Sequence, residues 1–390
     1  MEGKKETQIF LTKPLSLKGD VNDEDGVPNM LQRVLSLFKN VRSGSDLTRM
    51  QLPAIFNIPK SQLQCYGESV YCVGDDMLGK CNIEGSPSER FMAVVAWSIS
   101  TLRPVDFGVA PYNPILGETH HVSRGTLNVL LEQISHHPPV SVLHATDEKE
   151  NLELLWCQHP VPKFFDWKAN NAGTSVEAEI RGTRKLKLLN YGETYVMNSP
   201  KLSIKFFPVP GVEWTGNDRI RCYETGLEAK LSYGGRSFLG LRGNPGSIKG
   251  TIFESSSMKP LFEINGHWDR TVTVKDLTSG KVRVIYNSKE VISGLKTPMV
   301  KDPKGVWPSE SALVWGEVSQ GILNKDWGKA MEAKKAVEEK QRELLRDRNS
   351  RSETWAPKHF IVSYDKESGW DCLPMQNFVP PAPIVIPFNS

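Results

Sequence analysis

Thr271-Val272-Thr273-Val274 and Lys281-Val282-Arg283-Val284-Ile285-Tyr286 alternate apolar and polar side chains on the two sides of Thr278-Ser279-Gly280. Successive side chains of a strand point to opposite faces, so this alternation predicts two strands, and the glycine-containing segment predicts the turn of a hairpin. Short alternating segments separated by turn residues recur in the same way over residues 118–320. The pattern therefore predicts a region built mainly of antiparallel strands.

Three further segments place apolar side chains at every second position: Val176–Ile180, Leu186–Leu188 after Gly182, and Leu202–Phe206. Many short strands without long helices between them favour an antiparallel sheet that closes into a barrel. One chain that supplies so many strands makes a large barrel, which can hold a cavity instead of a filled core. The predicted fold class is α+β, mainly β.

Helical periodicity appears outside the long β region. Apolar residues recur at three- and four-residue spacing between Met30 and Val41, and residues 86–103 and 326–348 are also predicted to be helical. The first helix is short and amphipathic. It can pack on the protein's own core, or act as a movable lid or a membrane-surface helix, and Ser43-Gly44-Ser45 provides a flexible joint after it.

The bulk composition excludes several classes of protein. Of the 390 residues, 39% are hydrophobic and 24% are charged, which indicates a folded globular chain. The longest uninterrupted apolar run, Phe91–Trp97, is far shorter than the roughly 20 residues that span a bilayer. A net charge of +3 is too small for a nucleic-acid-binding surface. No apolar segment follows Met1–Glu6, so no signal peptide is expected, and 6 cysteines without Cys-x-x-Cys spacing predict a reduced, cytoplasmic protein.

No motif for catalysis or for a cofactor is complete. Gly74–Cys81 nearly matches a phosphate-binding loop, but Cys81 stands where a magnesium-binding hydroxyl is needed. No Gly-x-Ser-x-Gly nucleophile elbow occurs. The histidine pairs at 120–121 and 136–137 have no suitably spaced acidic or cysteine partner. The chain is expected to be no enzyme and to use neither a metal nor a cofactor.

Adjacent histidines lie in the octapeptide Glu132-Gln133-Ile134-Ser135-His136-His137-Pro138-Pro139. Proline has a fixed φ and no N–H, so the two prolines must end a strand or lie at a sheet edge. His136 and His137 are therefore expected at a strand end. Histidine changes its charge near neutral pH and can bind a phosphate there, although the pair can also be structural, hydrogen-bonded within a turn.

Lys334, Glu338 and Arg342 follow one another at four-residue spacing, so they fall on one stripe of the C-terminal helix. Such a stripe can be an ordinary solvated ladder of ion pairs. It also suits phosphate, because lysine supplies a compact charge, arginine supplies a bidentate donor, and glutamate can orient both bases. Spacing alone leaves both interpretations open.

Together these motifs resemble the oxysterol-binding-protein-related family of lipid-transfer proteins. Glu-Gln-x-Ser-His-His-Pro-Pro is the signature of that family, and Asn113–Glu118 is similar to its Asn-Pro-x-Leu-Gly-Glu segment. Lys334…Glu338…Gln341-Arg342 is similar to the motif of its C-terminal helix. The resemblance covers about residues 29–380 and fits the short members, which consist of the lipid-binding domain alone. It implies a large incomplete antiparallel β-barrel with a central lipid tunnel, an N-terminal lid helix and flanking helices.

The resemblance also implies the residues of the site. The headgroup of phosphatidylinositol 4-phosphate is expected to contact His136, His137, Lys334, Glu338, Arg342 and Asn113. The lid and tunnel are expected to include Leu31, Leu35, Phe38, Pro114, Ile115 and Leu116. The function it implies is non-vesicular transfer of a sterol or phospholipid between membranes, in exchange for phosphatidylinositol 4-phosphate. The alternative is a lipid sensor or scaffold that binds these lipids without bulk transfer.

The expected partners are membrane lipids and no nucleic acid. The protein is expected to be a cytoplasmic monomer with peripheral association to the endoplasmic reticulum, Golgi or plasma membrane. A mobile N-terminus is expected over residues 1–28, the lipid-binding domain over 29–380 and a tail over 381–390. The parts expected within the domain are a lid (29–45), an N-terminal helical part (46–117), the barrel (118–320) and a C-terminal helical part (321–380).

Two positions depart from the family's pattern. Ala110 lies three residues before Asn113, where the family often has lysine, so one phosphate contact is expected to be missing or supplied by Arg103 or another base. Val105 occupies the position at which sterol-binding members can place a glutamine near the sterol hydroxyl. The resemblance therefore leaves the identity of the second lipid open.

Overall fold

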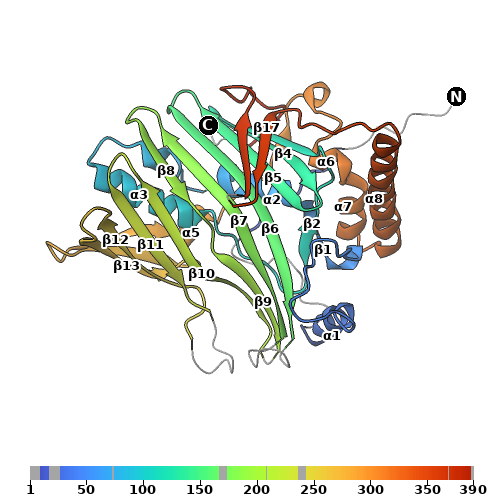
Figure 1. Ribbon diagram of the computed structural model, residues 1–390, viewed down its shortest axis with the longest axis horizontal. Coiled ribbons are helices and arrows are strands. Elements are labelled where there is room, and N and C mark those ends of the chain that lie inside the picture. The colour runs from blue at the N-terminus through green and yellow to red at the C-terminus, as the bar shows by residue number, and fades with distance from the viewer. Residues whose placement is uncertain are drawn as a thin grey trace.

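A computed structural model describes residues 9–16, 27–72, 74–166, 174–207, 209–235, 243–367 and 369–387. One large sheet dominates it (Figure 1). Its strands are β3 (Thr119–Arg124), β4 (Leu127–His136), β5 (Pro139–Asp147), β6 (Leu152–Phe165), β7 (Thr174–Leu188), β8 (Glu193–Met197), β9 (Lys201–Phe207), β10 (Gly211–Cys222), β11 (Leu227–Tyr233), β12 (Ser247–Glu254), β13 (Pro260–His267), β14 (Thr271–Asp276), β15 (Val282–Asn287), β16 (Met299–Val300) and β19 (Ile384–Val385).

The strand order is β15-β14-β13-β12-β11-β10-β8-β7-β6-β5-β4-β3-β19-β16, and β9 pairs with both β7 and β10. The pairs from β3 to β15 are antiparallel, whereas β19 runs parallel to β3. The hairpin predicted from the alternation is β14–β15, in which Val272 lies opposite Tyr286. In the described sheet the edge strands β15 and β16 do not pair with each other, so the barrel is incomplete, as predicted.

Gly182 lies inside β7 and does not divide it, so Val176–Ile180 and Leu186–Leu188 belong to one long strand. Its φ is +101°, and a Cβ atom there would lie 1.9 Å from the carbonyl oxygen of Cys157 on β6. Only glycine allows this backbone conformation together with so close an approach of two strands. The strand therefore continues past Gly182 from one end of the barrel to the other.

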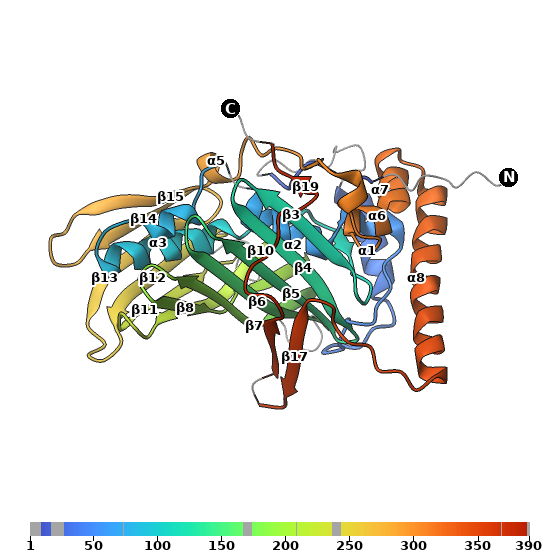
Figure 2. The ribbon, with the colours of Figure 1, turned by 90° about the horizontal axis from the view of Figure 1, so that it is seen from above.

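Helices α2 (Gln62–Tyr71) and α3 (Pro87–Ser100) lie within the curve of the sheet (Figure 2). Each begins at a capping box, Ser61 with Gln64 in α2 and Ser86 with Glu89 in α3. α2 packs against β3, β4 and β5, and α3 packs against β11 and β15. The helix predicted over residues 86–103 is thus confirmed as α3, and both helices fill the barrel.

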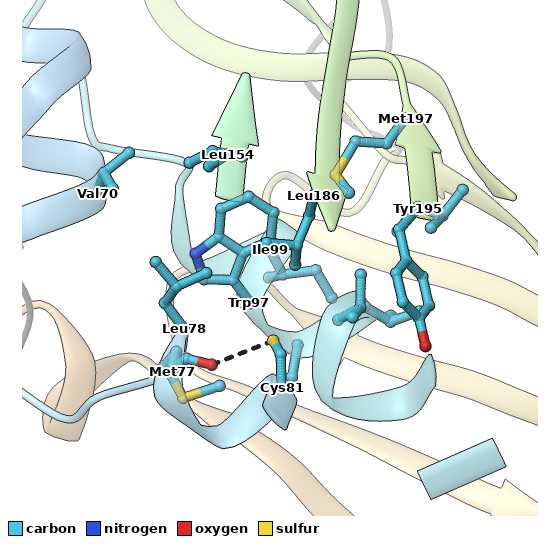
Figure 3. Packing of buried hydrophobic residues seen from close by; sticks show 14 of the residues in the cluster. Val70, Met77, Leu78, Cys81, Trp97, Ile99, Leu154, Leu186, Tyr195 and Met197 are labelled. Carbon is cyan, nitrogen blue, oxygen red and sulfur yellow. Dashed lines mark hydrogen bonds between the residues drawn. The ribbon is translucent and has the colours of Figure 1, made fainter. Parts of the chain in front are cut away.

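The main hydrophobic core lies where these helices meet the sheet (Figure 3). Trp97 of α3 is buried beside Leu154 of β6 and Leu186 of β7. Cys81 is buried there too, and its Sγ donates to the carbonyl of Met77 at 3.3 Å. Burying such side chains stabilises the fold by about 25 cal/mol per Å² of apolar surface. This end of the barrel is therefore filled, and room for a ligand lies towards the opposite end.

Helix α1 (Val27–Leu37) lies across that opposite end, near the ends of β6, β7 and β9 (Figure 1). Phe38 follows the helix and stacks on Phe164 of β6, with 4.9 Å between the ring centroids. It also stacks on Phe206 of β9 at 5.5 Å. The segment after the helix is fixed to β6, because the N–H groups of Gly44 and Leu47 donate to β6 carbonyls at 2.6 and 2.9 Å. α1 is thus placed as the predicted lid, although it ends at Leu37.

The flanking helices are α6 (Ser311–Val314), α7 (Gly316–Leu323) and α8 (Trp327–Ser350), with α8 outermost (Figures 1 and 2). α8 confirms the helix predicted over residues 326–348, and its N-cap Asp326 accepts the N–H of Lys329 at 3.1 Å. The remaining elements are η1 (Ala54–Phe56), β1 (Asn57–Ser61), η2 (Gly79–Asn82), β2 (Ala110–Tyr112), α5 (Ser288–Val291), η3 (Pro303–Gly305), β17 (Phe360–Asp365) and β18 (Gly369–Pro374). In the part of the chain that the structure describes, no helix has the length and apolar character needed to span a bilayer.

Residues 9–16 differ from the mobile N-terminus that was expected over residues 1–28. The N–H of Phe10 donates to the carbonyl of Ala312 at 3.2 Å. Nζ of the buried Lys60 donates to the hydroxyl of Thr12 at 2.6 Å and also contacts Glu68 at 2.6 Å. Residues 9–16 are therefore held in place over this buried ion pair. Residues 1–8 and 17–26 lie outside the described residues.

The C-terminal region also differs from the expected organisation. Ile384–Val385, expected in a tail, form β19 and complete the sheet between β3 and β16. The part expected to be helical over residues 321–380 contains the β17–β18 hairpin, because Phe360 and Cys372 are buried against the outside of β6. Within residues 118–320, expected to be barrel, the chain already forms the helices α6 and α7.

Candidate functional site

A cavity of about 420 Å³ lies beneath α1 and extends into the barrel. Its walls come from α1 and the segment after it, from β1, β2 and α2, and from β6, β7 and β9. Its apolar lining includes Val34, Phe38, Met50, Val176, Ile180 and Phe206. A concave apolar space of this size is typical of a site for a small apolar ligand.

The strand register shows how deep the cavity reaches. Val176, near the lid end of β7, and Arg184, further along the same strand, both line it. A strand rises about 3.3 Å per residue, so these two residues are roughly 26 Å apart. Trp156 of β6 is the partner of Arg184, and Leu154 and Leu186 beyond them belong to the filled core. Trp156 and Arg184 therefore form the floor of the cavity.

The floor is polar although it is buried. Arg184 donates to the hydroxyl of Thr101 at 2.7 Å, and Arg103 donates to backbone carbonyls at the ends of α2 and α3. Burial lowers the pKa of both guanidinium groups. Nε of each arginine and Nε1 of Trp156 have no hydrogen-bond partner among the described residues. Buried donors without acceptors favour an oxygen atom at the floor, from a ligand or from water.

The histidine pair lies beside the edge, or mouth, of the cavity: neither histidine is part of its wall, but Pro114, which His136 contacts, and Pro139, its strand partner, both line it. His136 is the last residue of β4 and pairs with Pro139, the first residue of β5, so the histidines lie at a strand end as predicted. Nδ1 of His136 lies 2.8 Å from the carbonyl oxygen of Pro114. A carbonyl only accepts, so Nδ1 carries the hydrogen, and Nε2 of the neutral ring is then an acceptor. Only the protonated ring can keep this bond and also donate to a phosphate.

Both histidines have lowered pKa values. Burial lowers the pKa of His136, while the Pro114 carbonyl and the Glu338 carboxylate oppose the shift. The pKa of His137 is lowered by burial and by the nearby charges of His136 and Arg49. The pair is therefore neutral in the empty protein near neutral pH. An anion at the mouth would favour the protonated form and raise both pKa values.

One buried carboxylate holds the turn that precedes β3. Glu118 accepts hydrogen bonds from the hydroxyls of Ser61 (2.5 Å) and Ser311 (2.7 Å), from Trp315 Nε1 (2.9 Å) and from the N–H of Ile115 (2.9 Å). Burial raises the pKa of Glu118, and the four donors oppose that shift. These contacts join β1, α6 and α7 to residues 113–118. The carbonyl that orients His136 is therefore on a fixed turn.

Helix α8 supplies charged side chains beside the histidine pair, although none of its residues is part of the cavity wall. Nζ of Lys334, a largely buried lysine, donates to Glu338 Oε1 at 2.5 Å. Arg342 lies 3.7 Å from Glu338 and donates to Glu339 at 2.7 Å. The charge of Glu338 also acts on the ring of His136. The fold thus brings the histidine pair and the charged stripe together, although they are far apart in the sequence.

The neighbouring pair His120-His121 is structural. His120 bonds Glu310 through Nδ1 at 2.5 Å and the hydroxyl of Tyr71 through Nε2 at 2.7 Å. His121 bonds the carbonyl of Pro380 through Nε2 at 2.9 Å. Among the described residues, no group of three His, Cys, Asp or Glu side chains is arranged to hold a metal ion.

Comparison with known families matches residues 34–318 to the family model "Oxysterol-binding protein". The chain belongs to the oxysterol-binding protein family. Oxysterol-binding protein-related protein 4C of Arabidopsis thaliana is 55% identical over 382 residues, covering 97% of this chain and 99% of that protein. Oxysterol-binding protein-related protein 8 of Homo sapiens is 30% identical over 339 residues, covering 84% of this chain and 37% of that protein.

Two solved structures share the fold of this oxysterol-binding protein family member. The Osh1 ORD domain in complex with cholesterol has a TM-score of 0.73 at 19% identity, covering 94% of this chain and 90% of that chain. The Osh3 ORD of Saccharomyces cerevisiae in complex with PI(4)P has a TM-score of 0.64 at 19% identity, covering 93% of this chain and 94% of that chain. At this identity the likeness establishes the fold alone.

Some of the predicted lid and tunnel residues of this family member line the cavity, and others lie outside its wall. Phe38 and Pro114 line the cavity, as does Asn113 at its exposed edge, and Leu31 packs beside Phe38. Leu35 lies on α1 but is 37% exposed and outside the cavity wall. Two other residues are also outside the wall: Ile115, which packs near Trp315, and Leu116, which is half-buried.

Val105 and Ala110, the two residues that depart from the family's pattern, both line the cavity, and Ala110 does so from β2. Of the bases expected to replace the missing lysine, Arg103 does not do so, because its guanidinium is bonded to helix-end carbonyls at the floor. The sequence interpretation did not identify Trp156, Arg184 or Arg49. Alternation from Ile180 could have placed Arg184 on the inner face of its strand, but its pairing with Trp156 depends on the register.

Proposed function

We propose that this protein carries lipids between membranes and exchanges a sterol or phospholipid for phosphatidylinositol 4-phosphate. One observation carries the proposal: two histidines and the bases of α8 are grouped beside the edge of a deep apolar cavity. The hydrocarbon part of a lipid inside avoids about 25 cal/mol of unfavourable free energy for each Å² kept from water. The charged headgroup remains at the mouth. We propose a monomer that contacts membranes peripherally and catalyses no reaction.

The headgroup contacts follow from the chemistry of the side chains at the mouth. Protonated His136 donates through Nε2 to the phosphate monoester, because Nδ1 stays bonded to Pro114. Lys334 supplies a point charge and Arg342 a planar pair of donors. Glu338 keeps both bases in place and can accept from inositol hydroxyls. Asn113, at the exposed edge, is positioned for the same headgroup.

The polar floor supports a sterol as the second ligand. An unpartnered donor on Arg103, Arg184 or Trp156 suits a single hydroxyl oxygen at the buried end of a ligand. The Osh1 domain in complex with cholesterol and the Osh3 domain in complex with PI(4)P lend support from proteins of this fold. Both ligands would use one cavity and would exclude each other, as exchange requires.

A transfer assay between two liposome populations tests exchange. Donor liposomes contain a fluorescent sterol, and acceptor liposomes either contain or lack phosphatidylinositol 4-phosphate. Exchange predicts that the phosphoinositide in the acceptor accelerates sterol delivery, because it displaces sterol and fills the cavity for the return. A sensor or scaffold would bind both lipids without equilibrating either, and this result would contradict the proposal. Chromatography of the recovered lipids would reveal any chemical turnover.

The phosphoinositide affinity is expected to fall as the pH rises above the lowered pKa that His136 has in the empty protein. The pKa of His136 is lowered in the empty protein and rises when the phosphate binds, so binding takes up a proton. Affinity is then complete below the free pKa and is lost towards the bound pKa, by at most about tenfold per pH unit for each proton. Titration of a short-chain phosphatidylinositol 4-phosphate at several pH values measures the slope. His136→Asn should bind more weakly with a flatter profile, and an equal slope in both proteins would contradict the assignment.

A further inference from the structure

Arg49 lies at the mouth on a segment whose backbone is fixed. The N–H of Leu47 donates to the carbonyl of Pro162 at 2.9 Å, and the N–H of Met50 donates to the carbonyl of Leu47 at 2.9 Å. Thr48 and Met50, on either side of Arg49, both line the cavity. The segment is therefore a firm turn along the rim, and the exposed side chain of Arg49 starts from this rim.

The charges at the mouth distinguish Arg49 from the bases on α8. Lys334 and Arg342 each contact a glutamate, Glu338 or Glu339, so these four side chains balance one another. Arg49 meets no carboxylate among the described residues, and its charge reaches His137. When the histidines are neutral, Arg49 differs from Lys334 and Arg342 in that no described glutamate contacts it and balances its positive charge. A phosphate arriving beside His137 would meet a guanidinium that need not give up an existing ion pair.

β2 adds no charge to the cavity wall in the described part of the chain. It contributes Ala110 and Pro111, and neither carries a charge. Arg103 is committed to the floor. A phosphate monoester carries about −1.5 to −2 charges near neutral pH and binds arginine through paired N–H donors. A phosphate monoester at the mouth therefore needs a further positive charge to balance its own. The side chain of Arg49 can supply that charge.

We propose that Arg49 is a ligand of the headgroup phosphate monoester, acting beside His137, and that it contributes to the preference for phosphorylated inositol lipids. This inference rests on the proposed function. It adds a residue from the lid-anchoring segment to a site otherwise made by the β4–β5 turn and α8.

Binding of a soluble short-chain phosphatidylinositol 4-phosphate, measured by calorimetry without any membrane, tests the role of Arg49. Arg49→Gln is expected to weaken binding by about tenfold to a hundredfold, the usual effect of losing a charge-assisted hydrogen bond. Binding of short-chain phosphatidylinositol, which has no monoester, should change less than threefold. Arg49→Lys should fall between, because it keeps the charge but loses the planar donors. Arg42→Gln, an exposed arginine of the same segment, is the matched control and should bind as the wild type does.

The outcomes separate this inference from the proposed function. If Arg49→Gln binds the phosphoinositide as tightly as the wild type, while a variant lacking both mouth histidines does not bind, Arg49 is no ligand and the proposed function stands. Equal weakening of both probes would show general attraction without contact to the monoester and would also overturn the inference. A defect confined to anionic vesicles would assign Arg49 to the membrane surface instead. If the wild type binds neither probe, the proposed function itself fails.

Discussion

Replacing both His136 and His137 with alanine is expected to abolish extraction of phosphatidylinositol 4-phosphate from liposomes. The change removes the donor that the Pro114 carbonyl orients towards the mouth, and it removes both groups that become positively charged when phosphate binds. Lys334 and Arg342 remain, but their charges are shared with glutamates. Extraction should fall to the background measured without protein. Sterol extraction should persist within about twofold, because the floor and the apolar wall are unchanged.

His267→Ala is the control for this double variant. His267 ends β13, bonds Asn244 at 2.9 Å and lines no part of the cavity. It should extract both lipids as the wild type does. Phosphoinositide extraction at the wild-type level by the folded double variant would show that the histidine pair is structural. Thermal unfolding of each protein establishes that it is folded.

Filling the cavity is expected to remove both lipid activities at once. Ala178 faces the cavity from the lid-end part of β7, between Val176 and Ile180. Ala178→Trp would place a large ring where a sterol or an acyl chain must lie. We expect extraction of sterol and of phosphatidylinositol 4-phosphate to fall at least tenfold in the liposome assay. Binding of a soluble inositol phosphate, measured by calorimetry, should be retained because the mouth is intact.

Glu179→Trp provides the matched control on the same strand. Neighbouring strand residues point to opposite faces, and the side chain of Glu179 is 47% exposed beside Arg181. This variant adds an equally large ring at the next position, outside the barrel, and should carry both lipids normally. If Ala178→Trp kept sterol extraction while folded, the ligand would have to lie elsewhere. If both variants lost activity, the effect would come from strand stability and not from the cavity.

The structural features that could be predicted from the sequence are those that depend on residues close together in the chain. The β14–β15 hairpin follows from alternation, and the place of His136 at the end of β4 follows from two prolines. α3 and α8 both follow from the helical periodicity of their residues. The association of His136 with Lys334 came from the family resemblance, because nothing local links residues so far apart.

The parts that sequence missed depend on register and on distant packing. Trp156 and Arg184 form the floor only because β6 and β7 pair in one register, continued past Gly182. Arg49 reaches the mouth because β6 carbonyls hold the preceding turn. Residues 9–16 were expected to be mobile, yet they cover the buried pair Lys60–Glu68. None of these relations leaves a periodic signal in the chain.

The short strand β19 sets the order in which the molecule can be completed during synthesis. Ile384 and Val385 lie between β3 and β16, and they are contributed by the last residues of the described chain. β3 is translated well before this partner, because Val122 of β3 and its partner Ile384 are far apart in the sequence. The nascent barrel therefore keeps an unpaired edge until β19 has been made, and such an edge is prone to unwanted pairing with other chains. The pairing of β19 with β3 and β16 ends that period of exposure.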